Sequence, residues 1–280
     1  MSSIHFVTFA TPAFRVRQWL LNRSALCFGK ADQLHVWTQA KLEQDGFTNR
    51  NSELFPNSVG FGWYAWKPYI ILRALHEASE GDLVIYQDVG RRDPVLISKP
   101  LRFWDKFLTE RGVDCLAGVR ISHWGANRLW TKRSVFQYLG LCDDRYKNEP
   151  QIQASWSVWK KCPRTESFVA EWAELCRQLD LVGGHLENGM DGEVSGFQEH
   201  RWDQSLLTLL ALRDGMPTLE PSDRMEPQLN EKCIDSFILN QNVGFGFQTF
   251  KLLLGAYHKL ELMLKKIGCG RNHQSSSANP

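Results

Sequence analysis

The sequence predicts an α/β protein with a mostly parallel central sheet flanked by helices. The run Leu83 to Tyr86 is apolar without alternation, which is typical of a strand covered by helices on both faces. Such runs alternate with segments of helical length, beginning with a β-α-β unit over residues 4–38. The chain of 280 residues is long enough to bury a sizeable core.

Residues 4–79 contain the first of these expected strands and helices. Strands are expected at residues 4–9 and 33–38, with a helix over 13–28 between them. Residues 41–62 are polar and broken by glycine and proline, so we expect a long loop there. A helix is expected from Trp66 to Ser79, because Pro68 suits a first helical turn, where its missing N–H would be unpaired anyway.

Expected strands and helices continue to follow one another after residue 100. Apolar residues at every second position of 151–159 predict a strand with one buried face. Residues 181–198 are rich in glycine and poor in periodicity, so a flexible loop is expected there. The other expected elements are helices over 100–111, 131–139 and 163–179, a strand over 113–119, and a helix that opens near Asp203.

Composition and charge exclude several classes of function. The formal charge of +2 is too small for a nucleic-acid-binding protein. The seven cysteines contain no CxxC pair, which indicates neither a disulfide framework nor a zinc site and favours a reducing compartment. No secretory signal and no apolar span of membrane length is found, so we expect a cytoplasmic protein without a transmembrane helix.

Asp88 is the first candidate for chemistry, because it follows the apolar strand directly. Open α/β sheets bind ligands beyond the carboxyl ends of their strands. A carboxylate there could hold a divalent cation on a diphosphate, and Gly90 permits a turn with close backbone approach. Arg91 and Arg92 could reach phosphate oxygens. The alternative is a strand-end aspartate that caps a turn.

Lys67 stands at the head of the helix that begins at Trp66. Its ammonium and the helix N-terminus could face the same anion, although an exposed, solvated lysine is the alternative. The neighbouring Trp63, Tyr64 and Trp66 could form a sugar platform, but aromatic side chains more often belong to the core.

The segment from His200 to Ser205 places an imidazole, a guanidinium, a carboxylate and an amide at a helix start. A carboxylate at Asp203 could take a proton from an acceptor hydroxyl or hold sugar hydroxyls by hydrogen bonds. The alternative is that Asp203 caps the helix, because aspartate is favoured at that position.

Together these motifs resemble a known family. The order of the 62–69 segment with its Trp-Lys-Pro, the 81–90 segment and the 200–205 segment is similar to bacterial polysaccharide-type glycosyltransferases of the nucleotide-diphospho-sugar transferase superfamily. The resemblance spans roughly residues 4–215 and implies the GT-A fold, a single Rossmann-like domain over 1–248. We expect a basic amphipathic helix over 249–269 and a disordered tail over 270–280.

The resemblance also implies roles for individual residues. Asp88 takes the place of the last acid of the metal-binding Asp-x-Asp motif, and Lys67 that of the basic residue on the donor diphosphate. Asp203 and Gln204 match the pair that faces the transferred sugar and the acceptor, with His200 beside them as a third catalytic candidate. The other expected donor contacts are Thr8, Phe9, Tyr86, Arg91, Gln153 and Arg201.

Two departures from the family pattern concern the metal. Tyr86 stands where the first acid of Asp-x-Asp is usual, and residues 236–250 contain no histidine to complete a metal shell. The resemblance implies a divalent cation, Mn²⁺ or Mg²⁺, held at Asp88. A site without metal, in which Lys67, Arg91 and Arg92 take the leaving-group charge, is the alternative.

Positive charge gathers at the end of the chain. Residues 250–280 carry five basic side chains against Glu261, and their apolar residues follow helical spacing over 250–267. Such a helix can lie on an anionic membrane, and it can equally pack on the domain with its lysines solvated. Peripheral contact with the inner face of the membrane is therefore one expectation.

The leading hypothesis is transfer of a sugar from a nucleotide-sugar donor to a hydroxyl of a glycan or glycolipid acceptor, as in surface polysaccharide biosynthesis. Sugar-phosphate nucleotidyl transfer is a second hypothesis, but Ala10 to Phe14 lacks the glycine-rich basic loop typical of those enzymes. A non-catalytic carbohydrate- or partner-binding protein with a degenerate site is the third, suggested by Tyr86.

Overall fold

The computed structural model describes residues 2–90, 95–186 and 189–219, together with residues 252, 255, 256, 259, 260 and 263. Arg91 and Arg92 lie outside the described residues, as do the 270–280 tail and, apart from those six positions, the predicted helix over 249–269. The fold and the candidate site below therefore concern residues 2–219.

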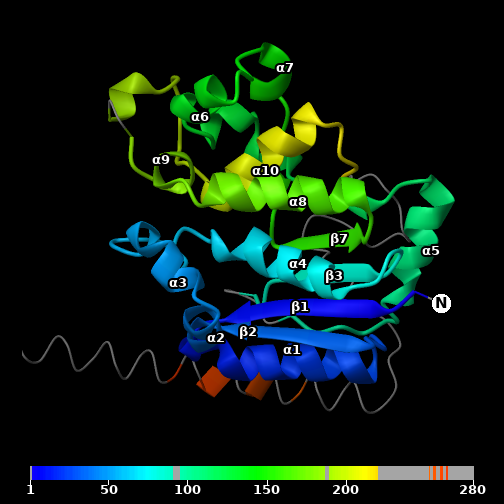
Figure 1. Ribbon diagram of the computed structural model, residues 1–280. Coiled ribbons are helices and arrows are strands. Elements are labelled where there is room, and N and C mark those ends of the chain that lie inside the picture. The colour runs from blue at the N-terminus through cyan, green and yellow to red at the C-terminus, as the bar shows by residue number, and fades with distance from the viewer. Residues whose placement is uncertain are drawn as a thin grey trace, which may run out of the picture.

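A five-stranded sheet forms the centre of the molecule, in the order β2-β1-β3-β7-β4 (Figure 1). Strand β1 pairs in parallel with β2 and with β3, whereas β7 runs antiparallel to both β3 and β4. Four of the five strands thus share one direction, which confirms the predicted mostly parallel sheet. The strands are β1 (Ile4–Ala10), β2 (Gln33–Thr38), β3 (Leu83–Gln87), β4 (Cys115–Leu116) and β7 (Trp156–Lys160).

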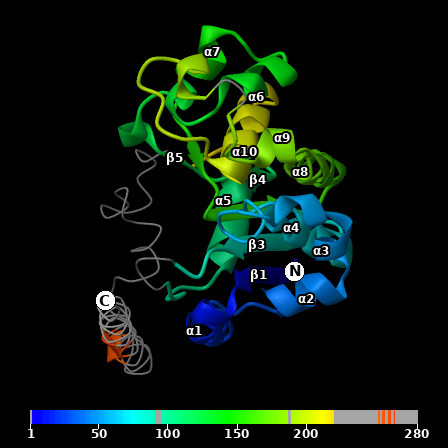
Figure 2. The ribbon, with the colours of Figure 1, turned by 90° about the vertical axis from the view of Figure 1, so that its left-hand side faces the viewer.

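Helices cover both faces of this sheet, which is why β1 and β3 are buried along their whole length (Figure 2). Alternate residues of each strand point to opposite faces. Phe6 and Ile85 pack with α1 (Arg15–Cys27) and α5 (Arg102–Arg111). Val7 and Tyr86 belong to the other core, with α4 (Trp66–Glu77), α8 (Pro163–Cys176) and α10 (Trp202–Arg213).

Shorter elements complete the described fold. The short helices are α2 (Gln39–Gln44), α3 (Phe47–Arg50), α6 (Arg133–Tyr138), α7 (Asp144–Lys147) and α9 (Leu179–Val182). The 3-10 turns are η1 (Pro12–Phe14), η2 (Ser52–Leu54), η3 (Ser122–Trp124), η4 (Asn127–Leu129) and η5 (Met190–Gly192). Strands β5 (Val119–Arg120) and β6 (Ile152–Gln153) form a separate two-stranded sheet.

Three expected elements differ from the structure. The 41–62 segment is not one loop, because it contains parts of α2, α3 and η2 around the buried Leu42, Phe47 and Leu54. The strand expected over 151–159 is two strands in different sheets, β6 and β7, separated at residues 154–155. The strand expected over 113–119 is likewise divided into β4 and β5. The apolar alternation over 151–159 continues across the break at 154–155, so it could not locate that break.

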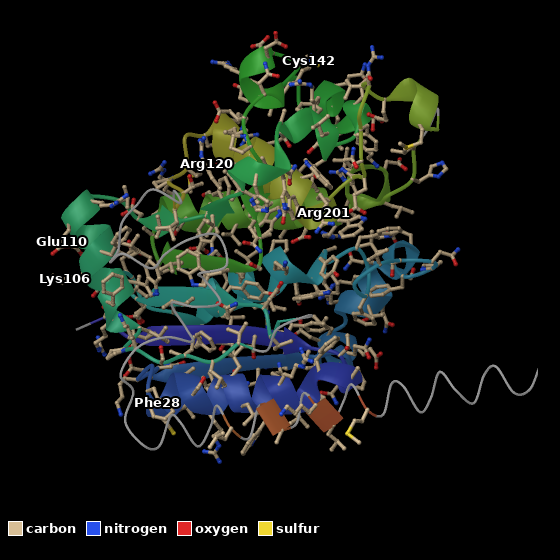
Figure 3. The ribbon with its side chains drawn as sticks, turned by 180° about the vertical axis from the view of Figure 1, so that it is seen from behind. Phe28, Lys106, Glu110, Arg120, Cys142 and Arg201 are labelled. Atoms are coloured by element: carbon tan, nitrogen blue, oxygen red, sulfur yellow. The ribbon has the colours of Figure 1, made fainter. Side chains whose placement is uncertain are left out.

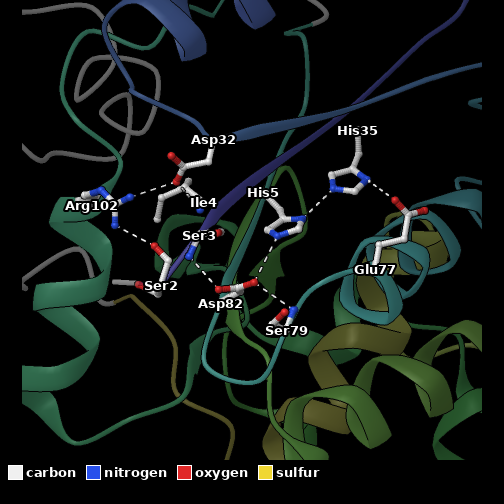
Figure 4. Close-up of polar contacts among 10 residues, drawn as sticks. All are labelled: Ser2, Ser3, Ile4, His5, Asp32, His35, Glu77, Ser79, Asp82 and Arg102. Carbon is white, nitrogen blue, oxygen red and sulfur yellow. Dashed lines mark hydrogen bonds and ion pairs between the residues drawn. The ribbon is translucent and has the colours of Figure 1, made fainter.

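A buried polar group fastens the edge of the sheet where β1 and β3 begin (Figure 4). His5 Nδ1 lies 2.9 Å from His35 Nε2, and the two rings stack. His5 Nε2 lies 3.5 Å from Asp82 Oδ2, and His35 Nδ1 lies 3.6 Å from Glu77 Oε2. Asp82 also accepts the backbone N–H of Ser3 at 2.7 Å. This group ties β1, β2 and the start of β3 together at the edge opposite Asp88.

Candidate active site

A pocket of about 570 Å³ opens at the carboxyl ends of β1 and β3. Its lining residues come from the end of β1 and the chain after it, the first residue of α2, the chain after β3, and the segment that leads into the first residue of α4. They are Phe9, Ala10, Thr11, Phe14, Gln39, Ser58, Val59, Gly60, Phe61, Tyr64, Trp66, Asp88, Val89 and Gly90. Asp88 follows β3 directly, as predicted, and Gly90 turns the chain with a φ of +76°. The volume is that of an ordinary small-molecule site.

Lys67 joins two carboxylates beside this pocket. Its Nζ lies 3.2 Å from Asp203 Oδ2 and 3.8 Å from Asp88 Oδ1. The Lys67 and Asp203 side chains are only 5% and 4% exposed, whereas that of Asp88 is 36% exposed. The structure thus brings together three residues singled out in the sequence, from α4, from the end of β3 and from the first turn of α10. Asp88 is the carboxylate of this group that reaches the pocket.

Tyr86 completes the group from within β3. Its side chain is fully buried, and its hydroxyl donates a hydrogen bond to Asp88 Oδ1. Burial raises the pKa of Tyr86 well above its ordinary value, and the Asp88 carboxylate raises this pKa further, so the phenol keeps its proton. The Asp88 backbone N–H donates to Ser155 O at 2.8 Å, which fixes the aspartate from the β7 side.

Burial and the neighbouring charges shift the pKa values of Lys67 and Asp203 in opposite directions. Burial alone disfavours the Lys67 ammonium, but the nearby Asp203 and Asp88 carboxylates outweigh it and raise the pKa of Lys67. Burial raises the pKa of Asp203 to about 6, although Lys67 acts to lower it. Near neutral pH the group therefore contains one buried cation between two carboxylates.

A left-handed turn leads into Lys67. Gly60, Phe61, Gly62, Trp63 and Tyr64 have φ values of +63°, +60°, +75°, +58° and +61°. Non-glycine residues rarely adopt this region, and such strain concentrates at functional sites. The turn is held by hydrogen bonds such as Trp63 N–H to Val59 O at 2.9 Å. Three residues of this turn line one wall of the pocket: Gly60, Phe61 and Tyr64.

The same turn touches the start of α10. Trp202 has a φ of +51°, and its ring lies 5.5 Å from that of Tyr64 and 6.4 Å from that of Trp63. Tyr64 and Trp66 also lie with their rings 5.3 and 5.9 Å from Lys67 Nζ. Aromatic packing therefore holds the segments that supply Lys67 and Asp203 against each other.

The two positions expected at the end of β1 differ in their surroundings. The Phe9 ring lines the pocket and stacks on Trp66, with 3.8 Å between ring centroids. Thr8 is fully buried; its hydroxyl donates to Asn22 Oδ1 at 3.1 Å and accepts from Gln18 Nε2 at 3.2 Å. Of the pair, Phe9 is the one that faces the pocket.

His200 is held by backbone groups on both sides of its ring. Nε2 lies 2.8 Å from Leu181 O, and Nδ1 accepts the Lys132 backbone N–H at 3.4 Å. Burial, aided by the charge of Lys132, lowers the pKa of His200 to about 3. This geometry indicates a neutral imidazole that fastens α9 and the backbone at Lys132. A catalytic role for His200 stays a prediction, and it would require the ring to exchange these partners.

Gln204 belongs to a buried chain of side-chain hydrogen bonds. Its Nε2 donates to Gln151 Oε1 at 2.9 Å, and Gln151 Nε2 donates to Asn127 Oδ1 at 2.6 Å and Thr131 Oγ1 at 2.9 Å. Thr131 Oγ1 in turn donates to Asn127 Oδ1 at 2.7 Å. This network fixes the first turn of α10 and therefore the position of Asp203. The sugar contact expected of Gln204 stays a prediction.

Two further expected donor contacts, Gln153 and Arg201, lie outside the lining of the pocket. Gln153 is paired with Val119 between β6 and β5. Arg201, labelled in Figure 3, forms an ion pair with Glu199, and its guanidinium lies 4.9 Å from the Trp124 ring. Donor contacts by these two residues remain predictions, and Arg91 falls outside the described part of the chain.

The described residues do not provide a donor set that suits a divalent cation. Within them, no group of three or more histidine, cysteine, aspartate or glutamate side chains could hold a metal ion. Asp88 is paired with the Tyr86 hydroxyl, and the nearest second carboxylate, Asp203, is paired with Lys67. The position between the two carboxylates is thus taken by an ammonium, and the fit to a Mn²⁺ or Mg²⁺ site is poor.

Two features of the site were not anticipated from the sequence. Arg17, buried in α1, donates from Nη1 to Gly90 O at 2.9 Å and so supports the chain after Asp88. The left-handed turn over residues 60–64 was predicted only as loop. Alternating glycine and aromatic residues in this turn were the available signal for a positive φ, because glycine tolerates it readily.

No protein-family model and no curated protein sequence matches this chain. One similar solved structure is mouse xyloside xylosyltransferase 1 in its apo form, at 10% identity and a TM-score of 0.41, covering 77% of this chain and 84% of that chain. Another is the galactosyltransferase LgtC in complex with donor and acceptor sugar analogs, at 12% identity and a TM-score of 0.40, covering 90% of this chain and 95% of that chain.

Among the residues that the structure describes, no helix combines the length and the apolar composition needed to cross a membrane.

Proposed function

We propose that this protein is a glycosyltransferase of the GT-A type that moves a sugar from a nucleotide-sugar donor to an acceptor hydroxyl. The observation that supports this best is the placement of Lys67, Asp88 and Asp203 beside a pocket at the carboxyl ends of β1 and β3. Parallel strand ends are where open α/β sheets bind nucleotides. A buried ammonium there suits a diphosphate leaving group.

The lining of the pocket suits a nucleotide. Phe9, Phe61 and Tyr64 present aromatic surface on which a base or a sugar ring can stack. Gly60 and Gly90 allow the ligand to approach the backbone closely. We place the nucleoside in this pocket, with the diphosphate directed toward Lys67.

In this reaction the bond between the sugar anomeric carbon and the diphosphate oxygen breaks, and a bond from the acceptor oxygen to that carbon forms. The diphosphate leaves with the extra negative charge, which we assign to Lys67 to stabilise. Asp88, the exposed carboxylate, hydrogen-bonds the transferred sugar or the acceptor. Asp203 holds the Lys67 ammonium, and a pKa of about 6 also suits it to accept the acceptor proton.

The acceptor that we propose is a hydroxyl of a glycan or a lipid-linked sugar in the cytoplasm, with use in surface polysaccharide synthesis. Peripheral membrane contact through residues 250–267 belongs to the same proposal, and it rests on the basic, helically spaced sequence of that segment. Liposome sedimentation of the full chain and of a triple variant, Lys259→Glu, Lys265→Glu and Lys266→Glu, tests this contact. Equal recovery with anionic vesicles would exclude it.

A screen of nucleotide-sugars tests the proposed reaction. One nucleotide class should raise the thermal midpoint of the full-length protein, and that donor should then be hydrolysed slowly or transferred to sugar acceptors. Asp88→Ala should lose transfer while still folding cooperatively, with a midpoint lowered by the lost hydrogen bond from the buried Tyr86 hydroxyl. Asp143→Ala, a change on an exposed ion pair, should leave transfer intact. Stabilisation without any turnover would instead favour a binding protein. Normal turnover in Asp88→Ala would defeat the assignment.

A further inference from the structure

We propose that the Lys67 ammonium is the resident cation of the donor site, so that a nucleoside diphosphate binds here without a divalent metal ion. This inference rests on the proposed function, because it concerns how the same site takes its donor. It departs from the divalent cation that the Asp-x-Asp resemblance implies, and it is argued from the residues around Lys67.

Lys67 occupies the position between the two carboxylates. Its Nζ is 3.2 Å from Asp203 Oδ2 and 3.8 Å from Asp88 Oδ1. A divalent cation shared by these carboxylates would need oxygen ligands at about 2.0–2.6 Å, which places the ion close to the ammonium. Two cations at that separation repel each other strongly in a buried site.

The surroundings of Lys67 leave it little freedom to withdraw. Its side chain is 5% exposed, and the rings of Tyr64, Tyr86 and Trp66 lie 5.3, 5.5 and 5.9 Å from Nζ. These aromatic faces favour a cation at this point. The backbone N–H of Lys67 also donates to Tyr64 O at 2.9 Å, which ties it to the left-handed turn.

Tyr86 stands in place of one of the two carboxylate ligands of an Asp-x-Asp motif, and it hydrogen-bonds the other, Asp88. A phenol stands where an Asp-x-Asp motif would supply a carboxylate, and its hydroxyl donates to Asp88 Oδ1. One oxygen of Asp88 is thus already committed to a hydrogen bond and faces an ammonium. The two carboxylates and Lys67 together carry one net negative charge, rather than the two that would attract a divalent ion.

The ammonium retains capacity for a phosphate oxygen. A lysine has three N–H donors, and the ion pair with Asp203 accounts for one of them. The 3.8 Å separation from Asp88 is too long for a hydrogen bond, so a phosphate oxygen that enters beside Asp88 can receive a donor from Lys67. The positive charge that stabilises the leaving group is then built into α4.

Calorimetric titration of the full-length protein tests this inference. UDP, GDP, CDP, ADP and dTDP are titrated in buffer with EDTA and in buffer with excess MnCl₂. The diphosphate that binds should show the same Kd within about threefold in both buffers. Lys67→Met should weaken its binding at least tenfold in EDTA, whereas Lys161→Met, which removes a partly buried ion pair with Glu166 away from the pocket, should not. A loss of more than tenfold on chelation that Mn²⁺ reverses would overturn the inference.

A second measurement separates this inference from the proposed function. The electron paramagnetic resonance signal of free Mn²⁺ is recorded as wild-type protein is added without nucleotide. The signal should stay undiminished. Depletion by wild type that disappears in Asp88→Asn would show a metal site and overturn the inference. If none of the five diphosphates binds in either buffer, the proposed donor class is wrong, and the Mn²⁺ signal still decides whether this site takes a metal.

Discussion

Lys67 Nζ and Asp203 Oδ2 lie 3.2 Å apart, although one residue lies in the first turn of α4 and the other in the first turn of α10. Both side chains are almost wholly buried. Removing one partner of a buried pair leaves an uncompensated charge, which costs far more than breaking an ion pair at the surface.

Asp203→Asn is therefore expected to lower the free energy of unfolding by about 3–5 kcal/mol. Lys67→Met should cost a similar amount, and the double variant should cost clearly less than the sum, because neither charge is then left alone. Urea denaturation of the four proteins measures this coupling. Glu166→Gln, at a more exposed ion pair with Lys161, is the control and should change stability by less than about 1 kcal/mol. Strict additivity would show that the pair is not coupled.

The pKa of about 6 at Asp203 predicts a pH dependence of transfer. Above pH 6 the carboxylate is charged and holds Lys67; below it, protonation removes that support and any capacity to accept a proton. We expect kcat/KM to fall about tenfold per pH unit below pH 6. In Asp203→Asn, kcat/KM should be low at every pH and should not fall further below pH 6. A profile that is flat for wild type from pH 5 to 7 would contradict this role.

Gly60→Ala tests the left-handed turn. A methyl group at Gly60 would lie 2.2 Å from the Tyr64 ring, in addition to the cost of an L-residue at φ +63°. Gly81→Ala is the matched control, because it has φ +84° and no atom within 4 Å of the added carbon. The control should lose about 1–2 kcal/mol, and Gly60→Ala should lose more and weaken nucleotide binding. If Gly60→Ala and Gly81→Ala lost the same free energy of unfolding and bound nucleotide equally well, the contact with the Tyr64 ring would be unimportant.

His200 predicts an acid-sensitive fold. Its folded-state pKa of about 3 lies below the ordinary value of 6.5, so the unfolded chain binds the proton more readily. The stabilisation is fully present above pH 6.5 and is lost as pH falls toward 3, by at most about 1.4 kcal/mol per pH unit. Denaturation at pH 7, 6 and 5 should show a smaller slope in His200→Gln. The exposed His185→Gln should keep the wild-type slope.

Sequence patterns located the strand-end chemistry because it depends on local order. An apolar run followed by Asp88 specifies both a buried strand and the edge where its side chain emerges. Lys67 was found for a similar reason, since Pro68 marks the helix start just after it. The ion pair between Lys67 and Asp203 could not be derived in this way, because it depends on how α4 and α10 pack.

The less accurate predictions share a physical cause. Apolar alternation over 151–159 continues through the break between β6 and β7, so periodicity gave no sign that the chain changes sheets. His200 and Gln204 have side chains suited to chemistry, but their partners are Leu181 O and Gln151, which are distant in sequence. Residue type alone could not separate these fastening roles from contact with a substrate.

Because β7 runs opposite to its neighbours, the effect of an inserted peptide should depend on which end of this strand it lies near. At its entry, the carbonyl of Ser155 accepts the N–H of the pocket residue Asp88, whereas at its exit, at the other end of the strand, the carbonyl of Lys161 accepts the Gly81 N–H. Residues added before Trp156 would displace Asp88 directly, while a peptide added between α8 and α9 would sit outside this strand connection. A library of inserted tags should therefore show a sharp minimum in activity at residues 154–155, within a chain that accepts additions more readily at its outer helices.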